Sequence, residues 1–294
     1  MNQPGAALEE EYVEARRVLL DALEALGPQR NAVIVAGAQA IYLRAGPGSL
    51  PIADFTTDGD LALDPALLTD APTLGDLMES AGFELAELQG APEPGIWQAP
   101  AIVNGIDVKI PIDLIVPKGV AAPGGTRGAQ LGPHGKRAAR KTAGLEAVLV
   151  DNEVMRIEAL DTADTRSSEV KVAGIAALLV TKTHKLNDRV ESHRQDRLDD
   201  KDASDVVRLM QTSSATQVAK TLSDLVTHPT AGAPTGLAIQ HFQALFGTRG
   251  DAGIEMAAQA LRLAMPEDRV RAICLAYANE LHSSLQTAGV DTAD

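Results

Sequence analysis

The sequence predicts an α/β or α+β domain at the N-terminus, followed by an all-α domain. Up to about residue 172, alternating apolar runs typical of strands are interspersed with apolar residues at helical spacing. From residue 173 the spacing is helical up to about residue 287, and the final residues 287–294 are predicted to be a frayed tail. Hydrophobic residues make up 45% of the 294 residues and charged residues 22%, an ordinary globular composition with enough apolar material for a real core. The predicted domains are therefore 1–172 and 173–294.

The N-terminal domain is predicted to open with an amphipathic helix over 7–27, which Gly27-Pro28 ends. The apolar run 32–36 indicates a short strand, and Gly37 begins a turn into a helix that ends near Ala45. Further elements are predicted as strands over 58–63, 83–88 and 106–116 and as a helix over 73–81.

The C-terminal domain is predicted to consist of helices separated by Gly, Pro or Ser/Thr. Their predicted ranges are about 174–193, 200–212, 215–227, 235–246, 252–264 and 266–287. Cys274 lies in the last of them, at an apolar position. Because it is the only cysteine, it cannot form an intramolecular disulfide, and we expect a buried small hydrophobe rather than a nucleophile.

Charge limits the possible partners. Lys and Arg number 26 against 40 Asp and Glu, so the formal net charge is −14. The chain therefore has no general attraction to nucleic acid or anionic lipid, and a polyanion must be held by a local basic patch or through divalent metal ions. The N-terminus is acidic and no apolar run approaches the length of a membrane span, so we expect a cytoplasmic protein without a membrane partner.

A pair of carboxylates, Asp58-Gly-Asp60, follows the glycine turn. Side chains two residues apart on a strand point to the same face, and two close carboxylates become favourable when a hard cation such as Mg²⁺ lies between them. Taken alone, the pair also fits a solvated Asp-Gly turn. Gly37 at a helix start, where backbone N–H groups bind phosphate, and a third carboxylate, Asp113, favour a metal and phosphate site.

These motifs resemble a known family. Residues 36–44, Ala-Gly-Ala-Gln-Ala-Ile-Tyr-Leu-Arg, followed by 56–61, Thr-Thr-Asp-Gly-Asp-Leu, look like the signature of the polymerase-β-type nucleotidyltransferase superfamily. The resemblance is greatest to the AbiEii-type branch, the nucleotidyltransferase toxins of bacterial toxin–antitoxin systems. Asp113 falls where this family places its third carboxylate.

Two more matches lie in the helical part, and together the motifs span about residues 31 to 210. Residues 176–184 resemble the family's helix that carries a functional lysine, with Lys182 as the best match and Lys185 as the alternative. Residues 201–209, Lys-Asp-Ala-Ser-Asp-Val-Val-Arg-Leu, look like the family's Arg-Asp-x-x-Asp-Leu motif, in which Asp202 would be the functional acid.

The resemblance implies a nucleotidyltransferase domain with a mixed sheet and an active site between it and the helical domain. The reaction would be in-line nucleotidyl transfer from an NTP with two Mg²⁺ (or Mn²⁺) ions held by Asp58, Asp60 and Asp113. Lys182 would reach the triphosphate, and Asp202 would orient Lys182 or the nucleotide. The implied catalytic residues are Asp58, Asp60, Asp113, Lys182 and Asp202, and the implied nucleotide-binding residues are Gly37, Ala38, Gln39, Thr57 and Lys185.

By the same resemblance the acceptor would be RNA, such as the 3′ end of tRNA, and a cognate antitoxin protein would be a partner. The family commonly has Gly-Gly or Gly-Ser where this chain has Gly37-Ala38, and the 19 residues between Ala38 and Asp58 make a longer connection than usual. These departures leave two alternatives: a nucleotide-binding protein that has lost transfer, and a small-molecule nucleotidyltransferase of the aminoglycoside-modifying kind.

Three features keep alternatives of their own. Residues 117–145 are rich in Gly, Pro and Ala and hold six basic residues and no acid. They predict a long flexible loop that either guides an RNA acceptor or is a surface insertion. Without the resemblance, Lys182 is interpreted as a surface lysine. His184, two residues from Lys182, either lines the active-site cleft or, as we expect, lies on the helix surface.

Overall fold

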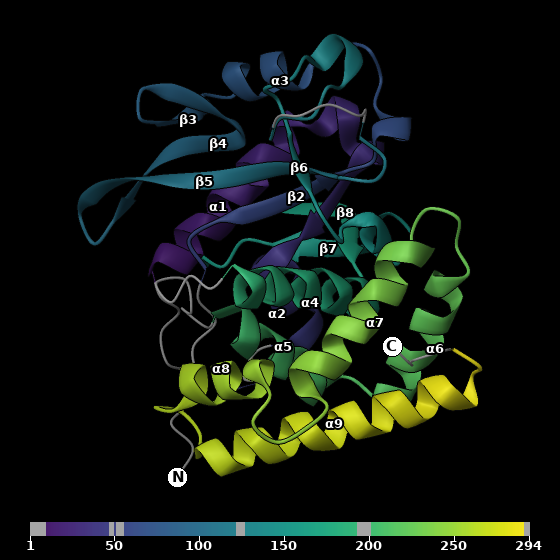
Figure 1. The fold of residues 1–294 in the computed structure, drawn as a ribbon. Coiled ribbons are helices and arrows are strands. Elements are labelled where there is room, and N and C mark those ends of the chain that lie inside the picture. The colour runs from purple at the N-terminus through teal and green to yellow at the C-terminus, as the bar shows by residue number, and fades with distance from the viewer. Residues whose placement is uncertain (1–9, 47–49, 51–55, 122–126, 193–200, 291–294) are drawn as a thin grey trace. The chain divides into compact units, whose positions relative to one another are not determined.

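The computed structural model describes residues 10–46, 50, 56–121, 127–192 and 201–290 (Figure 1). It confirms the predicted fold class, because an N-terminal mixed α/β sheet of eight strands precedes an all-helical region. The chain divides into two compact units. The first comprises 1–43, 53–142 and 152–173, and the second comprises 44–52, 143–151 and 174–294. The segment 143–151, which precedes the predicted domain boundary, thus belongs to the second unit.

The sheet of the first unit is mixed. Its strands are β1 (Val33–Ala36), β2 (Gly59–Leu63), β3 (Glu84–Leu88), β4 (Ala91–Val103), β5 (Ile106–Pro117), β6 (Arg140–Thr142), β7 (Asn152–Glu158) and β8 (Ser167–Ala173). They are ordered β3-β4-β5-β2-β1-β8-β7, with β6 paired to β5. The pairs β1–β8, β2–β5 and β5–β6 are parallel, and the others are antiparallel.

Helix α1 (Glu10–Ala25) packs against β4, β5, β2 and β8 (Figure 1). Its apolar residues at helical spacing, among them Val18, Leu19 and Leu23, are buried in that contact, as the periodicity predicts. Residues 7–9 of the predicted helix lie outside the described part. The remaining helices before the C-terminal region are α2 (Gly37–Ala45), α3 (Leu74–Ser80) and the 3₁₀ turns η1 (Gly27–Ala32), η2 (Pro65–Leu67), η3 (Gly132–His134) and η4 (Glu146–Leu149).

The C-terminal helices follow the predicted ranges closely. They are α4 (Ile175–Glu191), α5 (Lys201–Thr212), α6 (Ala215–Val226), α7 (Gly232–Phe246), α8 (Ala252–Leu261) and α9 (Glu267–Thr287). Cys274 is fully buried on α9, as expected, and burial raises the pKa of its thiol to about 12, which keeps it protonated and unreactive. Within the residues that the structure describes, no helix has the length and apolar character needed to cross a membrane.

Strands β4, β6, β7 and β8 are not predicted from the sequence. Three prolines, Pro92, Pro94 and Pro100, interrupt the sequence of β4, and proline is depleted in strands because it lacks the N–H donor. Strand β7 lies at the edge of the sheet and is mostly exposed, so its apolar alternation is weak.

The prediction of a long loop over 117–145 is wrong for Arg140–Thr142, which form β6, whereas most of the other described residues lie in turns or outside regular secondary structure. Strand β6 pairs with β5, and the Trp97 indole donates a hydrogen bond of 2.9 Å to the carbonyl of Ala138. Ala138 and Ala139 are buried. Small apolar residues thus anchor this segment in the core, although its Gly and Pro content suggests a loop. Residues 122–126 of the predicted loop lie outside the described part.

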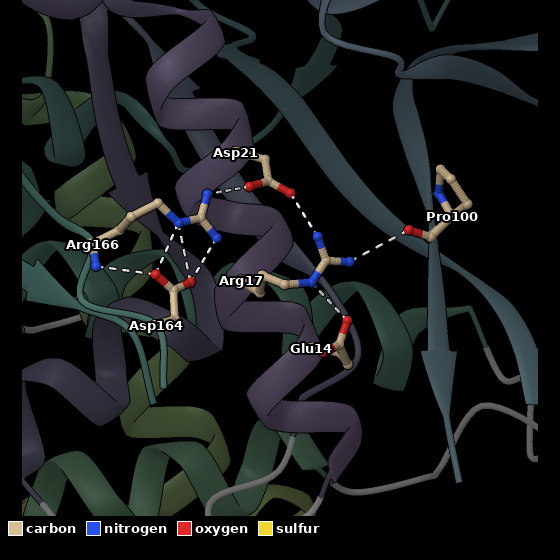
Figure 2. A network of polar contacts seen from close by, with 6 residues as sticks. All are labelled: Glu14, Arg17, Asp21, Pro100, Asp164 and Arg166. Carbon is tan, nitrogen blue, oxygen red and sulfur yellow. Dashed lines mark hydrogen bonds and ion pairs between the residues drawn. The ribbon is translucent and has the colours of Figure 1, made fainter. Parts of the chain in front are cut away.

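A network of ion pairs joins the polar side of α1 to the connection between β7 and β8 (Figure 2). Arg17 lies 2.8 Å from Glu14 and 2.9 Å from Asp21. Arg166 in turn contacts Asp21 at 2.5 Å and Asp164 at 2.6 Å. All five side chains are partly exposed, so this network holds the helix to the edge of the sheet without burying charge.

Candidate active site

Strand register brings two of the predicted site carboxylates together. Asp60 on β2 is the direct partner of Asp113 on β5 in a parallel pair. Direct partners on neighbouring strands point to the same face of the sheet. Asp58 precedes Asp60 by two residues, and its negative charge raises the pKa of the Asp113 carboxyl. The first unit therefore gathers these three carboxylates around the start of β2.

Gly37 lies directly against this group. It follows Ala36, the register partner of Asp60, and begins α2 with a φ of +61°. A Cβ on Gly37 would lie 1.8 Å from Oδ2 of Asp60. Both the left-handed backbone and the contact with Asp60 therefore require glycine. The Asp60 carboxylate lies at the first turn of α2, where unpaired N–H groups favour negative charge.

Ala38 and Gln39 occupy the same first turn, but their side chains face the protein interior. Ala38 is 6% exposed and Gln39 is 1% exposed. The Gln39 amide accepts a hydrogen bond of 2.9 Å from Nε of Arg16 and donates one of 3.4 Å to the carbonyl of Asp58. Gln39, predicted to contact the nucleotide, thus uses both ends of its amide within the protein and positions the backbone of Asp58.

Arg16 and Thr56 belong to the site although the sequence did not single them out. Arg16 is 3% exposed, and its guanidinium also donates to the Tyr12 hydroxyl at 3.1 Å. Its only sequence signal is a charge on the apolar face of α1. The buried Thr56 hydroxyl donates a bond of 2.5 Å to Asp58, whereas the predicted Thr57 is half-buried.

Asp113 makes an ion pair with Arg140 from β6. Asp113 is 9% exposed, and burial raises the pKa of its carboxyl above the ordinary value. Arg140 opposes this rise by stabilising the ionised form, and the charge of Asp58 adds to it. The cation nearest to the third carboxylate therefore comes from the basic segment that the sequence had suggested was a loop.

The fit of this group to a divalent cation is mixed. Carboxylate oxygen is the donor that Mg²⁺ and Mn²⁺ prefer, and the register brings these acids close together. In the described ranges, no group of three or more His, Cys, Asp or Glu side chains is arranged to hold a metal ion. The Asp113 oxygen is turned to Arg140 instead. The chemistry of the donor set fits a divalent cation, whereas the arrangement of the described side chains, with Asp113 paired to Arg140, does not form a metal site.

A second charged cluster lies in the helical unit. Nζ of Lys182 on α4 lies 2.6 Å from Asp202 and 2.7 Å from Asp205, both on α5. All three residues are at most 6% exposed, so the interpretation of Lys182 as a surface lysine is wrong. Burial disfavours the charged ammonium, but the two carboxylates outweigh it and hold the pKa of Lys182 above its ordinary value.

Asp202 is the centre of this cluster. It also contacts Lys185 at 3.2 Å and pairs with Arg189. Burial opposes its ionisation, yet the three surrounding cations keep the pKa of Asp202 well below its ordinary value. The side chain of Lys185 is 56% exposed, while the side chain of Lys182 is 8% exposed. Lys185 is therefore the lysine of the pair that is open to a ligand.

His184 is buried, so the prediction of a surface histidine is wrong. The residue is 7% exposed, and its Nε2 lies 2.8 Å from the carbonyl oxygen of Pro234 on α7. Its ring meets His241 edge to face at 5.5 Å. These contacts give His184 a packing role between α4 and α7.

The chain was compared with protein-family models, with curated proteins and with solved structures, and none of them matches it.

Proposed function

We propose that the protein is a metal-dependent nucleotidyltransferase that transfers a nucleoside monophosphate from an NTP to an acceptor. The observation that carries the proposal is the pairing of Asp60 with Asp113 beside Asp58, directly against the glycine start of α2. Three carboxylates repel one another unless a cation joins them. The adjoining helix start offers N–H groups to phosphate.

In this proposal Asp58, Asp60 and Asp113 hold Mg²⁺ or Mn²⁺. The bound metal would activate the acceptor hydroxyl and neutralise charge on the departing pyrophosphate. The backbone at Gly37 and Ala38 binds the polyphosphate, since the Ala38 side chain is buried and leaves only its N–H for this purpose. Gln39 and Arg16 hold the Asp58 backbone in place.

The proposal gives the residues of the helical unit separate roles. Lys182 holds Asp202 and Asp205, because its ammonium is buried between them. Lys185 is the lysine available to a phosphate group, because its side chain is exposed while its ammonium is held by Asp202. The two lysines that the resemblance left open are thereby assigned a positioning and a binding role.

We propose an RNA acceptor, such as the 3′ end of tRNA, and with it a cytoplasmic activity and a cognate antitoxin partner. Lys136 and Arg137 support the acceptor class: both are exposed on the anchored basic segment of the sheet unit, in a chain of net charge −14. Phosphate contacts of this kind weaken steeply as salt is added, whereas a small cationic acceptor of the aminoglycoside type has no such contacts to lose.

The experiment is transfer of label from each α-labelled NTP, with Mg²⁺, into total tRNA. Wild type is compared with Asp58→Asn and Asp113→Asn. Asp107→Asn is the matched control, because Asp107 lies on the same strand as Asp113 but is exposed. We expect each site variant to lose transfer roughly 100-fold or more while the control keeps it. Equal transfer by wild type and both site variants would remove the proposal.

A second candidate is a nucleotide-binding protein that has lost transfer. The pairing of Asp113 with Arg140 favours it, because this contact takes up the carboxylate that a metal would need. Absence of label from every NTP, together with nucleotide binding that survives Asp113→Asn, would select this candidate over the enzyme.

A further inference from the structure

We propose that Arg140 is the built-in counter-cation of the carboxylate site: it occupies Asp113 when no divalent ion is present, and a divalent ion must displace it to bind. The inference rests on the proposed function, because it concerns the same carboxylates. It adds a residue from outside the motifs that the sequence pointed to.

The strand register sets the contact. Arg140 on β6 is the parallel partner of Ile115 on β5, and Ile115 follows Asp113 by two residues. Residues two apart on a strand share a face, so Arg140 and Asp113 project to the same side of the sheet. The guanidinium therefore reaches Asp113 along the strand from a fixed neighbouring position.

The backbone that carries Arg140 is firmly held. Gly95 donates from its N–H to the carbonyl of Arg137 at 2.8 Å, and Lys141 donates to the carbonyl of Arg127 at 2.9 Å. A Cβ on Gly95 would lie 2.5 Å from the backbone nitrogen of Arg140, so the two strands approach as closely as glycine allows. Displacement of the guanidinium by a metal thus requires movement of the side chain alone.

The side chain itself is incompletely bound. Its Nη2 contacts Asp113, but its Nε is buried without a hydrogen-bond partner. A buried donor without a partner is unfavourable, so the present position is not the best available to a guanidinium. The side chain is 21% exposed, which leaves it a way toward solvent. Arg140 is therefore suited to leave when another cation takes its place.

Asp113 needs a cation in either state. Its side chain is 13% exposed, and Asp58 adds a second negative charge nearby. A carboxylate in such a position is unfavourable unless it is paired. Arg127 also acts on Asp113, but its guanidinium is bound to Glu93 at 2.7 Å. Arg140 therefore supplies the positive charge in the empty site, and the metal supplies it in the filled site.

The test is Mn²⁺ binding, measured by titration calorimetry and by the electron paramagnetic resonance signal of free Mn²⁺. Wild type is compared with Arg140→Gln, with Arg140→Lys, and with Arg156→Gln as the control. Arg156 lies on β7 of the same unit, is 63% exposed at its side chain and loses the same charge. We expect Arg140→Gln to bind Mn²⁺ roughly tenfold more tightly than wild type, since no guanidinium competes. Arg140→Lys should be intermediate and the control unchanged.

A double-variant cycle checks that the effect acts through Asp113. In an Asp113→Asn background, Arg140→Gln should no longer change Mn²⁺ affinity, because the ion pair is already broken. Folding of each variant is followed by circular dichroism and its urea midpoint. If Arg140→Gln does not fold, Arg140→Lys carries the same test through its weaker single contact.

The outcomes separate this inference from the proposed function. Mn²⁺ affinity that is unchanged or weaker in a folded Arg140 variant would overturn the counter-cation role and leave the nucleotidyltransferase proposal standing. No Mn²⁺ binding by wild type or any variant would overturn both, because the carboxylates would then hold no divalent ion.

Discussion

The carboxylate site of the sheet unit and the lysine cluster of the helical unit are built from the same residue types in opposite proportions. Asp58, Asp60 and Asp113 gather at the start of β2, where Arg140 binds one of them. In the second cluster Lys182, Lys185 and Arg189 surround two aspartates. The named groups of the first site leave an excess of negative charge, and those of the second leave an excess of positive charge.

This difference separates the acids that stabilise the fold from the acids that we assign to ligand binding. In the lysine cluster the buried carboxylates of Asp202 and Asp205 each have a cation within ion-pair distance, so the cluster contributes to folding. In the sheet unit the charge of Asp58 instead opposes the ionisation of Asp113, and like charges placed close together are a feature of sites that bind a ligand. The comparison therefore predicts opposite effects on stability when a charge is removed from each region.

The largest effect is expected for Lys182→Met. The substitution removes the shared cation of Asp202 and Asp205, which are 4% and 2% exposed at their side chains. Breaking a buried ion pair on one side leaves uncompensated charge, so we expect a loss of about 3–5 kcal/mol in the free energy of unfolding. Urea denaturation followed by circular dichroism measures it.

Lys185→Met is the matched control. Lys185 lies one turn further along α4, contacts the same Asp202 and is 56% exposed. An exposed ion pair contributes little, so the expected loss is below about 1 kcal/mol. If both variants lost the same amount of unfolding free energy, burial would not make the Lys182 ion pairs stronger than the exposed Lys185 pair.

The fold could be predicted from the sequence wherever the signal is local. The C-terminal helices follow from spacing within each segment, as in α9, where Cys274 lies at a buried apolar position. Strand β4 could not be predicted because its prolines argue against a strand, and the strand is formed through pairing with β5, which the local sequence does not indicate. The anchoring of the basic segment likewise depends on Trp97, which lies 41 residues from its bonding partner Ala138.

The sequence allowed prediction of several residues of the site but not of the contacts that those residues make. The spacing of Asp58 and Asp60 and the glycine before α2 were visible in the sequence. Which strand lies beside β2 was not, because the partnership of Asp60 with Asp113 depends on the order of the sheet. Arg140 and Asp113 are 27 residues apart, and no local pattern links them. The burial of Lys182 is set in the same way by acids on another helix.

Gly37→Ala should have the next largest effect, and it tests how closely the carboxylate site is packed. The new Cβ would overlap Asp60, and the backbone would keep a left-handed φ of +61°. We expect a loss of about 1–3 kcal/mol in the free energy of unfolding. Gly27→Ala is the control, because a Cβ there meets no atom within 4 Å.

A double variant separates the two causes of this loss. Asp60→Ala in the Gly37→Ala background removes the overlap but leaves the strained backbone. Partial recovery of the urea midpoint is expected. No recovery would mean that Asp60 does not press against Gly37.

A smaller effect of opposite sign is expected for Asp58→Asn. The change removes one negative charge beside Asp113 and keeps an oxygen that accepts the bond from Thr56. Without added metal, we expect stability to rise by about 0.5–1 kcal/mol, as is common when a site acid is neutralised. Asp202→Asn in the lysine cluster should instead lower stability. Urea midpoints of both variants at pH 7 test the contrast, and a fall in both would contradict it.

The smallest effect on stability is expected in the ion-pair network of Figure 2, whose side chains are partly exposed, unlike those of the lysine cluster. Hydrogen bonds from Arg166 lower the pKa of Asp164 from 3.8 to about 2. A carboxyl whose pKa is depressed in the folded state stabilises the protein above its unfolded pKa, and this contribution is lost as the pH falls through the folded value. The urea midpoint of wild type should therefore fall between pH 4 and pH 2 by more than that of Asp164→Asn.

The exposed Asp107→Asn serves as the control and should follow the wild-type curve. In 1 M salt the difference between wild type and Asp164→Asn should shrink, because Asp164 and Arg166 are both partly open to solvent and their attraction is screened. The loss of unfolding free energy caused by Lys182→Met should depend much less on salt, because the carboxylates that Lys182 contacts are buried. Equal salt sensitivity of the two would mean that burial does not separate the lysine cluster from a surface network.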